Sequence, residues 1–268
     1  MRLSDTRVLL TGASGGIGQA LVEVLGAGGA RLLLAGRQGE ALAAMARRFP
    51  DRVTVVQCDL RQRAGRDAVE DAVRRFGGVN CLVNAAGVNQ FALLERQDEE
   101  AIADLVAMNV TATLQLTRRL LPGLRRESAA LVVNVGSTFG SIGYPGFAAY
   151  CASKFALRGF SEALRRELAD SRVKVLYVAP RATRTAMNGA GVVAMNDELR
   201  VAMDTPREVA TRIAGAIRRE REELYLGWPE RFFVKLNGLL PRVVDQALRR
   251  QLPTIQRFAH PEQTKESA

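Results

Sequence analysis

Short apolar runs alternate with longer amphipathic segments along most of the chain. The runs are apolar at successive positions rather than at every second one, which is typical of strands buried on both faces. They cover residues 7–11, 31–36, 53–58, 81–86, 130–136, 173–179 and 223–227, and helical periodicity covers 17–28, 38–48, 61–76, 98–125, 148–169 and 206–220. This alternation predicts an α/β domain over residues 1–227: a Rossmann-like, doubly wound parallel sheet of about seven strands with helices on both faces.

Residues 228–268 depart from this alternation and are interpreted as an amphipathic helical extension with a polar tail. Apolar residues recur at helical spacing through 228–258, basic residues fall largely between them, and Pro241 is expected to divide two short helices. Such a segment can pack on a partner subunit, cover a pocket or lie on an anionic membrane surface. Packing or a dimer contact is favoured over peripheral membrane contact. The lone histidine, His260, is not expected to be a ligand or a base.

The net charge of +10 comes almost entirely from arginine. Arginine pairs recur on separate amphipathic segments, so we interpret them as solvated helix faces and expect no nucleic-acid partner. The three cysteines, Cys58, Cys81 and Cys151, have neither disulfide nor metal-ligand spacing and are expected to be free thiols, with no metal bound. The chain has no apolar run of membrane-spanning length, and its first residues lack a secretory signal core. These features predict a cytoplasmic protein.

A glycine-rich turn, TGASGGIG at 11–18, joins the first predicted strand to the first helix. Gly12 permits a tight turn. Gly16 and Gly18 allow a pyrophosphate to approach the backbone closely, and the helix N-terminus offers unpaired N–H groups. The position of this turn at the first strand–helix junction predicts a dinucleotide-phosphate site.

Tyr150 and Lys154 lie four positions apart in the stretch AAYCASKFAL, residues 148–157. On a helix this spacing places both side chains on one face. The pair alone is compatible with an ordinary surface helix, because Tyr-x-x-x-Lys is a frequent pattern.

The Thr-Gly-x-x-x-Gly-x-Gly spacing, together with further motifs in the same order, resembles the short-chain dehydrogenase/reductase family over residues 5–227. The further motifs are Asp59-Leu60 after the third strand, Asn84-Ala85-Ala86-Gly87 after the fourth, and Ser137 thirteen residues before Tyr150. The resemblance implies a catalytic set of Asn109, Ser137, Tyr150 and Lys154. Cofactor contacts are predicted for Gly12, Ser14, Gly16, Ile17, Gly18, Arg37, Asp59, Leu60, Asn84, Ala85, Gly87, Tyr150, Lys154, Pro180, Thr183 and Thr185.

The end of the second strand predicts the form of the nicotinamide cofactor. A carboxylate there would bond the ribose 2′-hydroxyl and repel a 2′-phosphate. This chain has Ala35-Gly36-Arg37 instead. The Arg37 guanidinium can hold a phosphate through two parallel hydrogen bonds, and the Ser14 hydroxyl can add a third. We therefore expect NADP(H).

The expected reaction is hydride transfer between the nicotinamide and a carbonyl compound or a secondary alcohol. Tyr150 is expected to act as general acid/base, with the Lys154 ammonium favouring the phenolate. Ser137 is expected to donate a hydrogen bond to the substrate oxygen. By resemblance, Lys154 also binds the nicotinamide ribose, and Asn109 holds a water that links Lys154 to solvent.

The loop after the sixth strand departs from the family, which usually has glycine at the position of Arg181. That side chain either crowds the nicotinamide or points outward, and Thr185 is favoured over Thr183 as the carboxamide contact. Residues 186–204, small and apolar, are expected to form a substrate lid. An apolar or bulky substrate (lipid-, steroid- or ketone-like) and a homodimer or homotetramer are expected. The alternatives are a non-catalytic NADP(H) sensor and a membrane-surface interaction protein.

Overall fold

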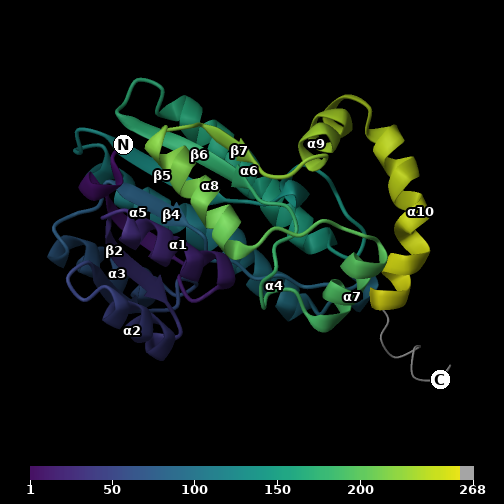
Figure 1. Ribbon diagram of the computed structural model, residues 1–268, viewed down its shortest axis with the longest axis horizontal. Coiled ribbons are helices and arrows are strands. Elements are labelled where there is room, and N and C mark those ends of the chain that lie inside the picture. Colours follow the sequence, from purple (N-terminus) through teal and green to yellow (C-terminus); the bar gives the residue numbers. More distant parts are fainter. Residues whose placement is uncertain (260–268) are drawn as a thin grey trace.

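The apolar runs form a single parallel sheet in the computed structural model of the protein, which describes residues 1–259 (Figure 1). His260 lies outside the described residues. The strand order is β3-β2-β1-β4-β5-β6-β7, with every neighbouring pair parallel. The strands are β1 Arg7–Thr11, β2 Arg31–Gly36, β3 Val53–Gln57, β4 Cys81–Asn84, β5 Ala130–Val135, β6 Val173–Ala179 and β7 Glu223–Tyr225. The predicted doubly wound fold is confirmed.

Helices cover both faces of the sheet, and its central strands pack apolar side chains on both sides (Figure 1). One face is packed by α1 (Gly16–Ala27), α2 (Gly39–Arg48) and α8 (Pro206–Arg218). The other face is packed by α3 (Arg63–Arg75), α5 (Thr113–Leu124) and α6 (Ala148–Glu167). Five of these helices match predicted segments closely; the sixth, α5, is the second half of the segment predicted at 98–125.

That segment is not one regular helix. It consists of α4 (Glu99–Val106), a π-helical stretch (Ala107–Ala112) and α5. Short 3-10 helices occur at Leu3–Asp5, Leu94–Arg96 and Thr138–Gly140. The loop expected to form a lid contains α7 (Ala190–Glu198), which the sequence did not predict.

The extension forms two helices, α9 (Glu230–Leu239) and α10 (Pro241–Ala259), as the position of Pro241 predicted. The second is not short: it runs for 19 residues with Pro253 inside it. Figure 1 shows α10 standing beside α7, at the opposite end of the molecule from α2. No helix in residues 1–259 is both long enough and apolar enough to cross a bilayer.

The strand order changes direction between β1 and β4, which are neighbours in the sheet but not in the chain. Ligands of open α/β sheets bind at such a switch point, beyond the carboxyl ends of the strands. The glycine turn follows β1 and the Asn84–Gly87 turn follows β4, so both lie at this edge.

Candidate active site

Three of the predicted catalytic side chains come from adjacent elements at the carboxyl edge of the sheet. Ser137 follows β5, and Tyr150 and Lys154 lie one turn apart near the start of α6. The Lys154 ammonium is buried, donates a hydrogen bond to the Val135 carbonyl at 3.2 Å, and lies 5.5 Å from the centroid of the Tyr150 ring. Ser137 and Tyr150 both line a cavity.

Burial controls the acidity of this pair. Desolvation raises the pKa of Tyr150 to about 12, and a hydrogen bond with the Ser137 side chain opposes the rise. Desolvation also lowers the pKa of Lys154 to about 8. The direction at Tyr150 is opposite to the expected lowering by the ammonium, because the cost of placing a phenolate in an apolar pocket is the larger effect. The phenol therefore carries its proton at neutral pH.

Asn109 lies in the π-helical stretch and is almost fully buried. Its amide oxygen accepts from the Val88 N–H at 2.8 Å, and its amide nitrogen donates to the Val88 carbonyl at 2.9 Å and to the Ser153 hydroxyl at 3.0 Å. A Cβ on Gly87 would lie 3.2 Å from the Asn109 oxygen and 3.6 Å from the Lys154 nitrogen. Asn109 and Lys154 thus flank the same glycine, and the predicted linking water stays a prediction.

Tyr177 supports the site from behind, a role that the sequence analysis missed. This buried β6 side chain donates a hydrogen bond from its hydroxyl to the Ser137 carbonyl at 3.2 Å. A Cβ on either Gly136 or Gly140 would lie 2.4 Å from that hydroxyl oxygen. Two glycines are therefore required where the tyrosine holds the backbone of Ser137. The available signal was an aromatic residue in a strand whose other residues, apart from Lys174, are aliphatic.

The glycine turn has the geometry of an anion site. Gly12 has φ +68°, and a Cβ there would lie 2.6 Å from the Ala86 nitrogen, so only glycine fits. The α1 helix starts at Gly16 with no side-chain cap and no acidic residue in its first turn. Its first N–H groups are consequently left for a ligand, which fits the pyrophosphate of a dinucleotide.

The two turns at the switch point are tied together. The Thr11 hydroxyl accepts from the N–H groups of Ala85 and Ala86, at 3.1 and 3.2 Å. Asn84 is buried and donates to Thr117 and to Asn134. These bonds hold β4 against β5 and α5.

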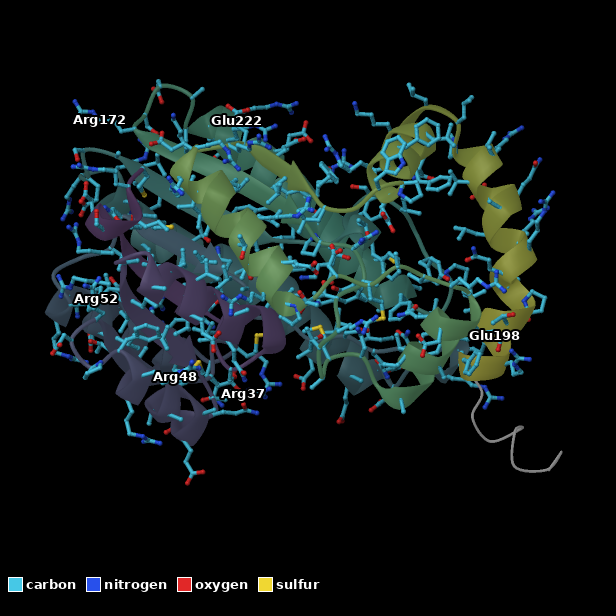
Figure 2. All side chains as sticks on the ribbon, viewed as in Figure 1. Arg37, Arg48, Arg52, Arg172, Glu198 and Glu222 are labelled. Atoms are coloured by element: carbon cyan, nitrogen blue, oxygen red, sulfur yellow. The ribbon has the colours of Figure 1, made fainter. Side chains whose placement is uncertain are left out.

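The predicted adenosine contacts lie away from the catalytic side chains. Arg37 is exposed beside α2, far from α10 (Figure 2). The Asp59 carboxylate forms an ion pair with Arg61 at 2.7 Å, and hydrogen bonding from Arg61 lowers its pKa. Leu60 is buried, and its carbonyl accepts from Arg66 at 2.6 Å. Ser14 lies in the glycine turn, where its carbonyl accepts from Gln19 at 2.8 Å.

The loop after β6 contacts both the glycine turn and the turn that carries Ser137. The Pro180 carbonyl accepts from the Thr138 N–H at 2.9 Å. The Thr185 methyl lies against the glycine turn, since a Cβ on Gly16 would be 2.7 Å from it. Thr183 is buried, and its hydroxyl donates to the Arg181 carbonyl at 2.9 Å. Thr185 is accordingly the threonine with the less committed hydroxyl.

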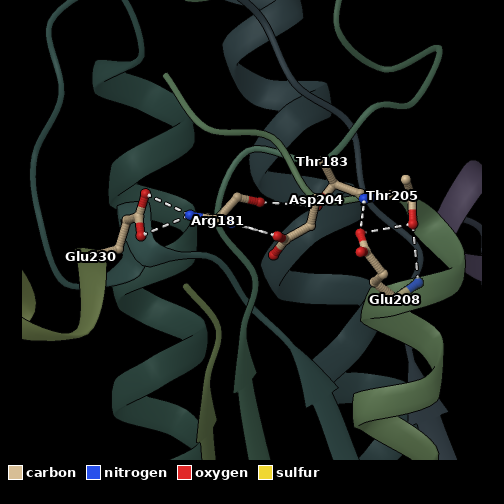
Figure 3. Close-up of polar contacts among 6 residues, drawn as sticks. All are labelled: Arg181, Thr183, Asp204, Thr205, Glu208 and Glu230. Carbon is tan, nitrogen blue, oxygen red and sulfur yellow. Dashed lines mark hydrogen bonds and ion pairs between the residues drawn. The ribbon is translucent and has the colours of Figure 1, made fainter. Parts of the chain in front are cut away.

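The Arg181 side chain is held by two acidic residues, Asp204 and Glu230 (Figure 3). Its guanidinium donates to Asp204 at 2.7 and 3.0 Å and lies 3.3 Å from Glu230, the first residue of α9. A Cβ on Gly227 would lie 2.6 Å from the Arg181 Cδ atom. The arginine therefore ties the loop after β6 to the start of the C-terminal extension.

The cavity above Ser137 and Tyr150 has a volume of about 390 Å³. The Ser137 end carries the aromatic residues Phe139, Tyr144 and Phe147, and α7 contributes Val192 and Met195. The C-terminal helices complete the wall with Phe233, Leu236, Val243, Val244, Ala247, Leu248 and Gln251. Of the roles considered for the extension, covering the pocket is therefore one that it fulfils.

Comparison with known proteins shows the class to which this site belongs. The family described as short chain dehydrogenase matches residues 6–194, so the chain belongs to the short-chain dehydrogenase family. The family consists of oxidoreductases, and two solved structures similar to this chain contain a nicotinamide dinucleotide. The chain is 33% identical, over 224 residues, to a 3-oxoacyl-[acyl-carrier-protein] reductase of Vibrio cholerae, covering 80% of this chain and 90% of that protein.

Two solved structures have the same fold with different cofactors. A short-chain dehydrogenase of Burkholderia cenocepacia in complex with NADP superposes with a TM-score of 0.79 at 26% identity, covering 92% of this chain and 99% of that one. A 3-ketoacyl-(acyl-carrier-protein) reductase of Brucella melitensis complexed with NADH also gives 0.79, at 25% identity, covering 85% and 99%. These two neighbours do not distinguish the two cofactors for this chain.

Proposed function

We propose that this chain is an NADP(H)-dependent oxidoreductase that transfers a hydride between the nicotinamide and an apolar carbonyl compound or its secondary alcohol. One observation carries the proposal: Ser137 and Tyr150 face a cavity whose remaining walls are largely apolar, with the Lys154 ammonium buried beside them. A bound nicotinamide supplies or accepts the hydride.

The protein's part is to hold the substrate oxygen and to move one proton. With a pKa of about 12, the Tyr150 hydroxyl is protonated at neutral pH and can donate to the oxygen of a carbonyl group. Lys154, with a pKa of about 8, is mainly an ammonium at pH 7 and stabilises the phenolate that this donation leaves. The Ser137 hydroxyl holds the oxygen on which charge develops.

The walls of the cavity support a bulky, apolar substrate. Four of the wall residues are uncharged: Phe139, Phe147, Met195 and Phe233. Binding among them would transfer the apolar part of a substrate out of water, which is favourable. Ser137 and Tyr150 supply polar groups for a carbonyl oxygen, and a few further polar residues, among them Gln251 and the paired Arg181 and Glu230, also line the cavity. A molecule with one carbonyl on a lipid-, steroid- or ketone-like body matches this division.

Tyr150→Phe tests the proposed reaction. The ring keeps its contacts with Phe139 and Phe147, so NADPH binding should persist, whereas turnover should fall at least about a hundredfold because the transferable proton is gone. NADPH absorbance across a panel of ring and chain-length carbonyls gives turnover, and NADPH fluorescence gives binding. Unchanged turnover would remove Tyr150 from the reaction and end the proposal.

The preference for NADP(H) rests on charge at the end of β2. Arg37 is exposed there, and no carboxylate occupies the last positions of the strand. Arg37→Asp should therefore lower the ratio of NADPH-dependent to NADH-dependent activity by about tenfold or more. Arg48→Asp, a change at the end of α2, is the matched control and should leave the ratio alone. A constant ratio in Arg37→Asp would show that Arg37 does not contact the phosphate.

A further inference from the structure

The two C-terminal helices are fixed to the domain by their inner side. Glu230 pairs with Arg181, the Asn237 amide donates to the Ser141 carbonyl at 2.9 Å, and the Tyr144 hydroxyl donates to Gln251 at 3.1 Å. Near its end, α10 is held by an ion pair between Arg257 and Glu198 of α7. These polar side chains on the inner side of the two helices therefore already have partners within the chain.

Large apolar side chains of this C-terminal segment are also exposed to solvent. Six of the exposed large apolar side chains among the described residues fall within 228–243: Trp228, Phe232, Phe233, Leu239, Leu240 and Val243. We call this set the hairpin tip. Leu239 is 81% exposed and Trp228 is 75% exposed. The other exposed large apolar residues are spread over β3, α6, α7 and the region around α4, so this concentration is specific to the tip.

Positive charge surrounds the hairpin tip. Arg231, Lys235 and Arg242 are all exposed within the same segment. Glu230 is taken up by Arg181, which leaves Asp245 as the nearest acid not paired within the described residues. Apolar side chains ringed by cations match the chemistry of an anionic lipid surface, where rings and aliphatic groups enter the headgroup boundary and cations meet phosphates.

We propose that the hairpin tip docks the enzyme on an anionic lipid bilayer. A second copy of the chain fits less well, because a two-fold contact between tips would bring the cationic set Arg231, Lys235 and Arg242 against the same set. Phe233 and Val243 belong both to the tip and to the cavity wall. Docking therefore brings the wall of the substrate cavity to the membrane surface. The inference does not depend on the proposed reaction.

The test is co-sedimentation of the full chain with phosphatidylcholine vesicles, with and without phosphatidylglycerol. We expect binding to vesicles containing phosphatidylglycerol, weakened by salt. The double variant Leu239→Asp, Leu240→Asp should reduce the partition coefficient by about tenfold or more. Leu94→Asp, a change at a residue that is 58% exposed in the 3-10 helix before α4, is the matched control and should bind like the parent chain.

Circular dichroism and NADPH fluorescence establish that each variant is folded. Equal sedimentation of the double variant and the parent, or no preference for anionic vesicles, overturns the inference. Analytical ultracentrifugation addresses the other occupant: if the double variant converts a dimer to a monomer while vesicle binding stays the same, the tip is a subunit interface. Tyr150→Phe should sediment like the parent, so failed docking and a failed reaction are distinguishable.

Discussion

The floor and the roof of the cavity are built on different physical principles. The floor, from the π-helical stretch, β6, α6 and the turn after β5, places polar groups out of water and gives several of them partners: Asn109 with Val88 and Ser153, Lys154 with Val135, Tyr177 with Ser137. The roof, α9 and α10, presents aliphatic and aromatic groups and is tied down at a few points. Desolvated polar groups allow one arrangement, because a lost partner costs about 1–3 kcal/mol. Apolar contacts are non-directional, so the side chains of α9 and α10 can shift to fit the substrate. The polar groups of the floor meanwhile keep one arrangement.

The largest effect is expected when the floor loses its cation. Lys154→Met keeps the length of the side chain but removes the charge that stabilises the phenolate, so turnover should fall by about a hundredfold or more. The free energy of unfolding, in contrast, should increase. Folding lowers the pKa of Lys154 from 10.5 to about 8, so the unfolded chain holds this proton more tightly, and the charge is a cost of folding that is fully present below pH 8.

This cost disappears as pH rises from 8 to 10.5, so parent stability should rise through that window. In urea unfolding at pH 7, Lys154→Met should therefore be more stable than the parent by roughly 1–2 kcal/mol, after allowing for the lost bond to Val135. The difference should shrink above pH 8. A difference independent of pH would show that Lys154 is not a buried ammonium.

Adding one methyl group should distinguish the two regions next. In Gly140→Ala the new Cβ would lie 2.4 Å from the Tyr177 hydroxyl and 2.7 Å from the Lys154 carbonyl oxygen, so the floor must shift. We expect a loss of about 2–3 kcal/mol in the free energy of unfolding, with reduced turnover. Gly238→Ala in α9 meets nothing within 4 Å and should gain up to about 0.5 kcal/mol. Equal tolerance at both positions, in urea melts, would contradict the contrast between floor and roof.

The smallest effect is expected where roof and floor meet. Arg181→Gly leaves Asp204 and Glu230, both less than a quarter exposed, without their cation and releases the start of α9. KM for the carbonyl substrate should rise about tenfold while kcat changes less than about threefold, since the proton-transfer groups are untouched. Arg184→Gly, at an exposed neighbour, is the control. A fall in kcat at constant KM would place Arg181 in the chemistry instead.

The sequence was sufficient for the sheet, whereas the catalytic set stays a prediction. β1, β2 and β4 to β6 are buried on both faces, so their apolar runs had few other interpretations. The glycine turn was identified from local spacing, whereas the roles of Tyr150 and Lys154 came from the family resemblance. The role of Tyr177 was not predictable, because it depends on contact between β6 and the turn after β5.

Long-range pairing explains the other omissions. Glu230 is 49 residues from Arg181, and nothing near either residue indicates the ion pair. The rise in the pKa of Tyr150 was missed because the one-turn spacing to Lys154 is local, whereas burial is produced by Phe139, Phe147 and the helices that close the cavity. Charge proximity was visible in the sequence and desolvation was not.

The π-helical stretch that holds Asn109 also limits how the chain can tolerate deletions. A π-turn contains more residues than an α-turn, so residues 107–112 accommodate a surplus that a regular helix would not. Removing one residue there would restore a regular α-helix, in which α4 and α5 keep the faces that they present to their neighbours. Leu116 and Leu120 would still pack on the sheet, whereas Asn109 would lose the position that the π-helical stretch gives it. In this chain a more regular helix and a correctly oriented Asn109 exclude each other.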